Sequence, residues 1–173
     1  MTAPVDFQFT PKPKRPPTIQ LALKGGGVVG SFISGTFVRT STFIEKKVDP
    51  KTNQVIETPK HRYVFQVTDT SEKKAWIFTK MNVPPTETPV ATGGQYTIMG
   101  RTDLDRQMDD VRANPSQFVN VPFMITYAGY EPNRHGGKSH IFDVQWDARY
   151  IGHAQAPAAG GEGDRGEGGP RAG

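Results

Sequence analysis

The prediction of the fold starts from the segment Arg62-Tyr-Val-Phe-Gln-Val-Thr-Asp-Thr-Ser-Glu-Lys-Lys-Ala-Trp-Ile-Phe-Thr-Lys80. Its two ends, Tyr63 to Thr68 and Ala75 to Thr79, are rich in the aromatic and β-branched residues that favour strands. The segment between them, Asp69 to Glu72, supplies side chains that form turns. We therefore expect a β-hairpin at the centre of a mainly β domain.

Composition restricts the chemistry of the chain. It has 173 residues, a formal net charge of +4 at pH 7 and no cysteine. Disulfides, thiolate nucleophiles and Cys-based zinc sites are therefore excluded. We expect a flexible, basic, proline-rich arm over residues 1–18, a folded domain over 19–153 and a disordered Gly- and Ala-rich tail over 154–173. No stretch has the length and apolarity of a membrane span or a secretory segment, so we expect the cytoplasm, or the host cytoplasm for a viral protein.

Further strands and loops are expected in the part of the chain that precedes Thr102. Ser31 to Ile44 reads as a long strand, in which Gly35 marks a bulge or bend. Glu45 to His61 is polar and is expected to form an exposed loop. Prolines predict another loop from Met81 to Thr92, and Gln95 to Met99 is expected to be a short extended piece that is not one of the main strands.

The only strong helix signal runs from Thr102 to Ala113. Thr102 and Asp105 resemble a capping box, and the Asn114-Pro115 pair predicts the end of the helix. Apolar residues recur on one face, at the spacing of an amphipathic helix. These residues are Leu104, Met108 and Val111.

Two strands are expected after the helix. Phe118 to Tyr127 alternates between apolar and polar residues, and Pro122 suggests an edge position or a bulge. A loop from Ala128 to Lys138 then leads to the last strand, His140 to Trp146. Five strands with a helix between the third and fourth predict an OB-fold-like five-stranded Greek-key barrel, all-β with small α content.

The chain resembles the OB-fold single-stranded DNA-binding proteins of bacteriophages over about residues 25–150. Three features carry this resemblance: the glycine-rich segment Gly25–Gly30, the aromatic segment Tyr63–Phe78 and the closing pattern Ile125–Val144. The resemblance implies binding of single-stranded DNA without strong sequence preference, which protects it during phage DNA replication or recombination. RNA, a homo-oligomer and replication or recombination proteins stay open as further partners. The weakly charged end, Gly160–Gly173, departs from the acidic tails of the bacterial proteins.

Aromatic rings and cations support the same function, because bases stack on rings while phosphates attract positive charge. For Trp76 and Phe78 we expect an outward face; burial of both rings in the core is the alternative. The candidate nucleic-acid-binding residues are Trp76, Phe78, Tyr63, Phe65, Lys46, Lys47, Lys60, Arg62, Lys73, Lys74, Lys80, Arg134 and Lys138.

Catalysis, a cofactor and a metal site are not expected. Strand alternation places His140 and Asp143 on opposite faces, and no nucleophile-turn motif is present. Gly25–Gly30 is followed by neither the Lys-Ser/Thr pair nor the helix of a phosphate-binding loop. The competing function is that of a non-enzymatic phage structural or adaptor β-barrel protein, because a fold alone does not define a function.

Overall fold

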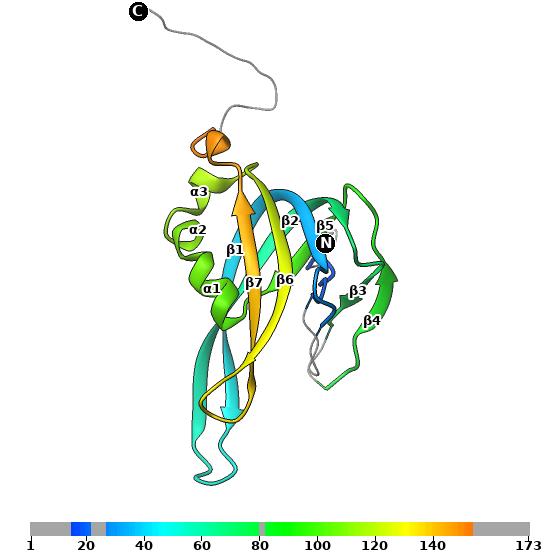
Figure 1. Cartoon of the computed structure of the whole chain (residues 1–173). Helices are drawn as coiled ribbons and strands as arrows, with labels where there is room; N and C mark the ends of the chain where they lie inside the picture. Colours follow the sequence, from blue (N-terminus) through cyan, green and yellow to red (C-terminus); the bar gives the residue numbers. More distant parts are fainter. Residues whose placement is uncertain (1–14, 22–26, 80–81, 154–173) are drawn as a thin grey trace, which may run out of the picture.

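The computed structural model describes residues 15–21, 27–79 and 82–153, which form mostly β-strands with short helices (Figure 1). The strands are β1 (Phe32–Val48), β2 (Val55–Thr70), β3 (Lys74–Ile77), β4 (Thr86–Pro89), β5 (Gln95–Met99), β6 (Pro122–Pro132) and β7 (Lys138–Trp146). The helices are α1 (Thr102–Gln107), α2 (Asp109–Ala113) and α3 (Pro115–Phe118), and a 3-10 turn, η1 (Ala148–Tyr150), follows β7. The expected tail and most of the expected basic arm lie outside the described residues, as does Lys80.

The main sheet is antiparallel and has five strands in the order β5-β2-β1-β6-β7. β3 and β4 form a separate antiparallel pair, which lies across the molecule from the helices (Figure 1). The helices follow β5 in the chain, so the expectation of a mainly β domain with a helical segment before its fourth main strand is confirmed. Among the described residues, no strand pairing joins the outer strands β5 and β7, and the sheet does not close into a barrel.

The hairpin expected between Tyr63–Thr68 and Ala75–Thr79 is wrong. β2 pairs with β1 and β5, whereas β3 pairs with β4. The turn-forming side chains bind the start of β1 instead. The Thr70 hydroxyl donates to the Phe32 carbonyl oxygen at 2.6 Å, and Ser71 Oγ accepts from the Phe32 N–H at 2.8 Å. These side chains therefore end the β1–β2 ladder and do not close a hairpin onto β3.

The loop expected at Glu45–His61 is also wrong, because most of it belongs to strands. β1 continues to Val48 and β2 begins at Val55, so the two strands form a hairpin that projects from the body of the molecule (Figure 1). We call residues 39–62 the β1–β2 arm. At its turn, Asn53 has a φ of 56° and its N–H donates to the Asp49 carbonyl oxygen at 2.8 Å. Asparagine tolerates this left-handed conformation, which allows the turn to be tight.

Thr18 connects the two sheets. Its backbone N–H and carbonyl oxygen pair with those of Trp76 in β3, each at 2.8 Å. On its other side, the Thr97 N–H of β5 donates to the Pro17 carbonyl oxygen at 2.8 Å. Thr18 is buried, although it falls within the expected flexible arm. The loop predicted at Met81–Thr92 is wrong in part, because β4 occupies residues 86–89.

The bend expected in β1 is confirmed. The register between β1 and β2 shifts at Ser34/Gly35 and again at Phe37/Arg39. A Cβ atom at Gly35 would lie 2.2 Å from the Gln66 carbonyl oxygen, so the close approach of the two backbones requires glycine. The two bulges let one strand serve both the core sheet and the arm.

Aromatic side chains fill the inner face of the main sheet. The ring centroids of Phe37 and Phe65 lie 5.8 Å apart, and those of Phe65 and Phe123 lie 5.5 Å apart. The alternation predicted for the fourth main strand is confirmed from Val121 onward, whereas Val119, which was predicted on the same face, is half-buried and precedes β6. Four apolar residues of this face are buried. These are Val121, Phe123, Ile125 and Tyr127.

The helix predicted at Thr102–Ala113 is interrupted at Met108, which separates α1 from α2. Its apolar face is fully buried, as predicted. The capping box is wrong, because α1 has no side-chain cap and the Asp105 carboxylate instead accepts from the Tyr63 hydroxyl at 2.6 Å. α2 ends at Ala113 as expected, but Pro115 begins the further helix α3.

The boundaries of the last two strands differ from the expectation. β6 begins at Pro122, whereas Phe118 belongs to α3. Pro122 is the first residue of a strand that pairs on both sides, a position where its missing N–H is tolerated. The loop expected at Ala128–Lys138 is mostly strand and shrinks to a turn, in which Asn133 Oδ1 accepts from the Gly137 N–H at 3.0 Å.

Candidate nucleic-acid groove

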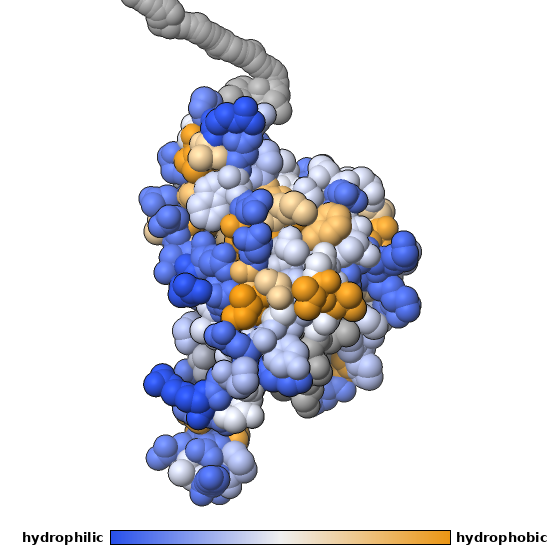
Figure 2. Space-filling model, in the orientation of Figure 1, coloured by the Kyte–Doolittle hydropathy of each residue, from blue (hydrophilic) through white to orange (hydrophobic). Residues whose placement is uncertain are grey.

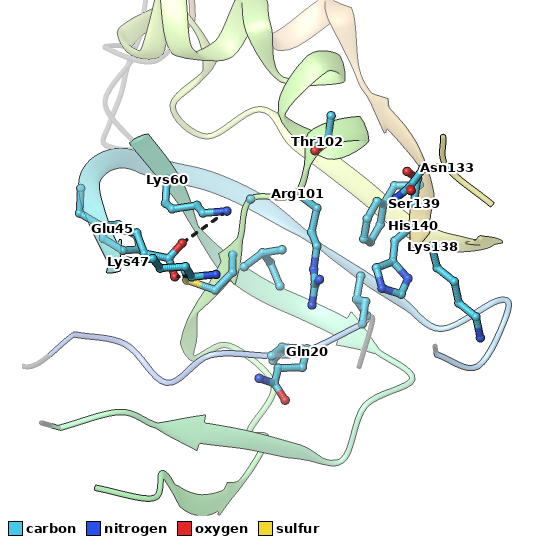
Figure 3. Close-up of a pocket in the computed structure, with 17 residues that line it drawn as sticks. Gln20, Glu45, Lys47, Lys60, Arg101, Thr102, Asn133, Lys138, Ser139 and His140 are labelled. Atoms are coloured by element: carbon cyan, nitrogen blue, oxygen red, sulfur yellow. Dashed lines mark ion pairs between the residues drawn. The ribbon is translucent and has the colours of Figure 1, made fainter. Parts of the chain in front are cut away.

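A groove of about 460 Å³ opens where the β1–β2 arm, the end of β5 and the start of β7 meet (Figure 3). Four of the side chains that line it are basic, and the carboxylate of Glu45 also lines it. The basic residues are Lys47, Lys60, Arg101 and Lys138. We call this feature the cationic groove.

Strand register explains the wall that the arm provides. Phe43 stands opposite Lys60 across the β1–β2 ladder. Because side chains alternate between the two faces of a strand, Glu45 and Lys47 share the face of Phe43 and Lys60. All four line the groove, whereas Lys46 points to the other face of the arm.

Glu45 pairs with both lysines of this wall. Its carboxylate oxygens lie 3.7 Å from Lys47 Nζ and 3.6 Å from Lys60 Nζ. The Glu45 side chain is 35% exposed and those of Lys47 and Lys60 are 73% and 40% exposed, so water reaches all three groups. Ion pairs of this length and exposure contribute little to folding stability.

The opposite wall carries Lys138 and His140 from β7, and Arg101 extends between the two walls (Figure 3). The Tyr127 hydroxyl lies 2.9 Å from His140 Nδ1. Burial lowers the pKa of His140 below its ordinary value of 6.5, and the positive charges of Arg101 and Lys138 lower it further. The positive charges of Arg101 and Lys138 therefore disfavour a proton on His140.

Two cation–ring contacts involve residues of the groove: one is on Phe43, which lines the groove, and the other joins Lys138, which lines it, to Tyr130, which does not. The Arg62 guanidinium carbon lies 3.7 Å from the centroid of Phe43, a ring that lines the groove. Lys138 Nζ lies 4.2 Å from the centroid of Tyr130, whose side chain is 51% exposed. Burial, followed by the charge of Arg15, lowers the pKa of Arg62.

The structure brings together only some of the predicted residues. Lys47, Lys60 and Lys138 line the groove, and Arg62 stacks on one of its rings. Tyr63 and Phe65 require correction, because both are fully buried and neither ring is accessible to a base. They lie on the core face of β2, and the Tyr63 hydroxyl also accepts from Arg112 Nη1 at 2.7 Å.

The aromatic residues of the expected second hairpin strand lie in β3 and just after it, apart from the groove lining. Trp76 is half-buried, and Phe78 is 45% exposed. Ala75, which precedes Trp76 and lies on the opposite face of β3, is fully buried. Lys73 is exposed, and Lys74 Nζ lies 3.2 Å from a carboxylate oxygen of Glu87 in β4.

Sequence reasoning missed residues of the groove and included others that lie outside its lining. Lys46 and Arg134 are exposed but do not line the groove. Arg101 and His140 do line it, and neither was selected as a binding residue. Nothing in the local sequence of Arg101 indicates a site, because its position depends on the chain reversal between β5 and α1.

The surface of the projecting arm is mainly hydrophilic in the orientation of Figure 2. Among residues 15–21, 27–79 and 82–153, no group of His, Cys, Asp and Glu side chains is arranged to hold a metal ion. Within the same residues, no helix has the length and apolarity needed to span a membrane. Comparison of the chain with protein-family models, curated proteins and solved structures found no significant match.

Proposed function

We propose that this protein binds single-stranded DNA in the cationic groove without strong sequence preference. The observation that carries the proposal is the convergence of Lys47, Lys60, Arg101 and Lys138 on one open groove. Proteins that bind single strands use such a positively charged groove to follow the phosphate backbone. The resemblance noted above implies a role in phage DNA replication or recombination.

The strand order supports an OB-fold-like architecture that is left open between β5 and β7. In that fold, oligonucleotides bind across the second and third strands and between the loops that join strands one to two and four to five. The corresponding connections here are the β1–β2 arm and the β6–β7 turn, and both contribute to the lining of the cationic groove.

Two rings supply the stacking surfaces that this mode of binding needs. Phe43 and Tyr130 already hold a cation against one ring face. A base can replace the Lys138 ammonium on Tyr130, which frees the lysine for a neighbouring phosphate. Stacking of this kind tolerates any sequence, because every base presents a π-face.

The function is tested by fluorescence anisotropy of labelled oligo-dT at several salt concentrations. Neutralising three or four phosphates should give a slope of log K against log salt of about −2 to −3. Lys138→Gln should weaken binding roughly three- to tenfold at low salt and make the slope less negative by about 0.7. Lys46→Gln, which removes the same charge from the outer face of the arm, is the matched control and should change binding little.

Absence of saturable binding by the unchanged protein at low salt would refute the proposal and favour the structural or adaptor function. Equal losses for Lys138→Gln and Lys46→Gln would instead indicate a general charge effect and place binding outside the groove.

A further inference from the structure

Glu45 is the carboxylate that lies between two cations of the cationic groove (Figure 3). Its two oxygens face different lysines, Lys47 at 3.7 Å and Lys60 at 3.6 Å. A phosphate group presents the same arrangement, a negative charge shared by oxygens that accept from separate donors. The carboxylate thus occupies the place where a phosphate would contact both lysines.

A contribution to folding stability does not explain why Glu45 lies between the two lysines. Both ion pairs are long and exposed to water, and such pairs contribute little to folding. The cross-strand neighbour of Glu45 is Thr58, which carries no charge. On the other face of the arm, Lys46 and Glu57 stand opposite each other, so that face is already balanced.

We propose that Glu45 is an internal counter-anion, which a phosphate must displace from Lys47 and Lys60 and which limits the affinity of the groove. This inference rests on the proposed binding of single-stranded DNA. A protein that covers single strands transiently must also release them, and a built-in competitor for two of the cations weakens the complex without removing the groove.

The first test compares Glu45→Gln with Glu57→Gln in the oligo-dT anisotropy assay. Both substitutions remove one negative charge from the same arm, but only Glu45 lies in the groove. Glu45→Gln should bind about three- to tenfold more tightly than the unchanged protein at low salt, and salt should reduce this advantage. Glu57→Gln should change affinity by less than about twofold. Thermal melting of both variants verifies that the domain remains folded.

A double-mutant cycle tests the displacement itself. Lys60→Gln should cost little affinity in the unchanged protein, because Glu45 already compensates that charge. The same substitution made in the Glu45→Gln background should cost at least about three times more.

The outcomes separate this inference from the proposed function. If the unchanged protein binds oligo-dT but Glu45→Gln binds no more tightly, the inference is overturned and the function stands. Equal gains for Glu45→Gln and Glu57→Gln, or an additive cycle, also overturn it. If the unchanged protein does not bind oligo-dT, the proposed function fails first.

Discussion

The Asp103 carboxylate accepts a hydrogen bond from the backbone N–H of Phe142 at 2.9 Å. Gln107, one helical turn later, donates to the Phe142 carbonyl oxygen at 2.7 Å and accepts from the Val144 N–H at 3.2 Å. Two side chains of α1 thus satisfy backbone groups on the outer edge of β7. A strand closing a barrel would pair with these same groups, so helix α1 takes the place of the β5–β7 pairing.

Asp103→Ala should destabilise the fold by about 1–3 kcal/mol, because it leaves the buried N–H of Phe142 without an acceptor. Urea unfolding measures the change. Asp110→Ala provides the control, since it removes an exposed carboxylate of α2 and should stay within about 0.5 kcal/mol of the unchanged protein. Equal stabilities for the two variants would show that the β7 edge does not depend on Asp103.

Tyr130→Ala should weaken binding of oligo-dT by about 1–3 kcal/mol, because a base would lose its stacking surface. Folding stability should change little, since half of the Tyr130 surface is exposed and the ring lies outside the core. Tyr150→Ala is matched to it: this ring in η1 is 48% exposed against 51% for Tyr130, and no residue of η1 lines the groove, whereas Tyr130 contacts the groove residue Lys138. If anisotropy titrations give the two variants equal affinities for oligo-dT, stacking on Tyr130 is excluded.

His140 should make the protein less stable as the pH falls below about 6.5. Burial, with the charges of Arg101 and Lys138, lowers the pKa of His140 in the folded state. The unfolded chain therefore takes up the proton first, so unfolding becomes easier in acid, whereas above the unfolded pKa both states are neutral and His140 has no effect. Melting temperatures of the unchanged protein and of His140→Gln from about pH 7.5 to about pH 5.5 measure this difference.

Between about pH 7.5 and about pH 5.5, His140→Gln should lose less stability than the unchanged protein. His153→Gln, an exposed histidine after η1, serves as the control and should follow the unchanged protein. A His140→Gln profile parallel to that of the unchanged protein would contradict the prediction.

Local sequence patterns predicted the buried face wherever apolar residues recur at the period of a helix or a strand. The helix face of Leu104, Met108 and Val111 and the alternation of Phe123, Ile125 and Tyr127 are both buried as expected. The bend at Gly35 was also predictable, because only glycine fits where two backbones approach this closely.

Strand partners were not predictable in the same way. The alternation of β2 shows that one face is buried, but it does not identify which strand lies beside it. The short polar segment Asp69–Glu72 favoured β3 as the partner of β2. In the structure, β2 instead pairs with β1 over a much longer ladder and with β5 along its other edge. Residues 45–61 of the arm lack an apolar alternation on either face, so the sequence predicted a loop there.

Composition and local pattern predicted a mainly β domain, its helical segment before the fourth main strand and the surplus of positive charge. Which of the cations lie close together depends on the tertiary structure. Lys47, Lys60, Arg101 and Lys138 are far apart in the chain, and bulges, strand register and the reversal after β5 bring them to one groove. Local sequence specifies backbone conformation and the buried face, whereas proximity of distant side chains depends on long-range pairing that no short segment encodes.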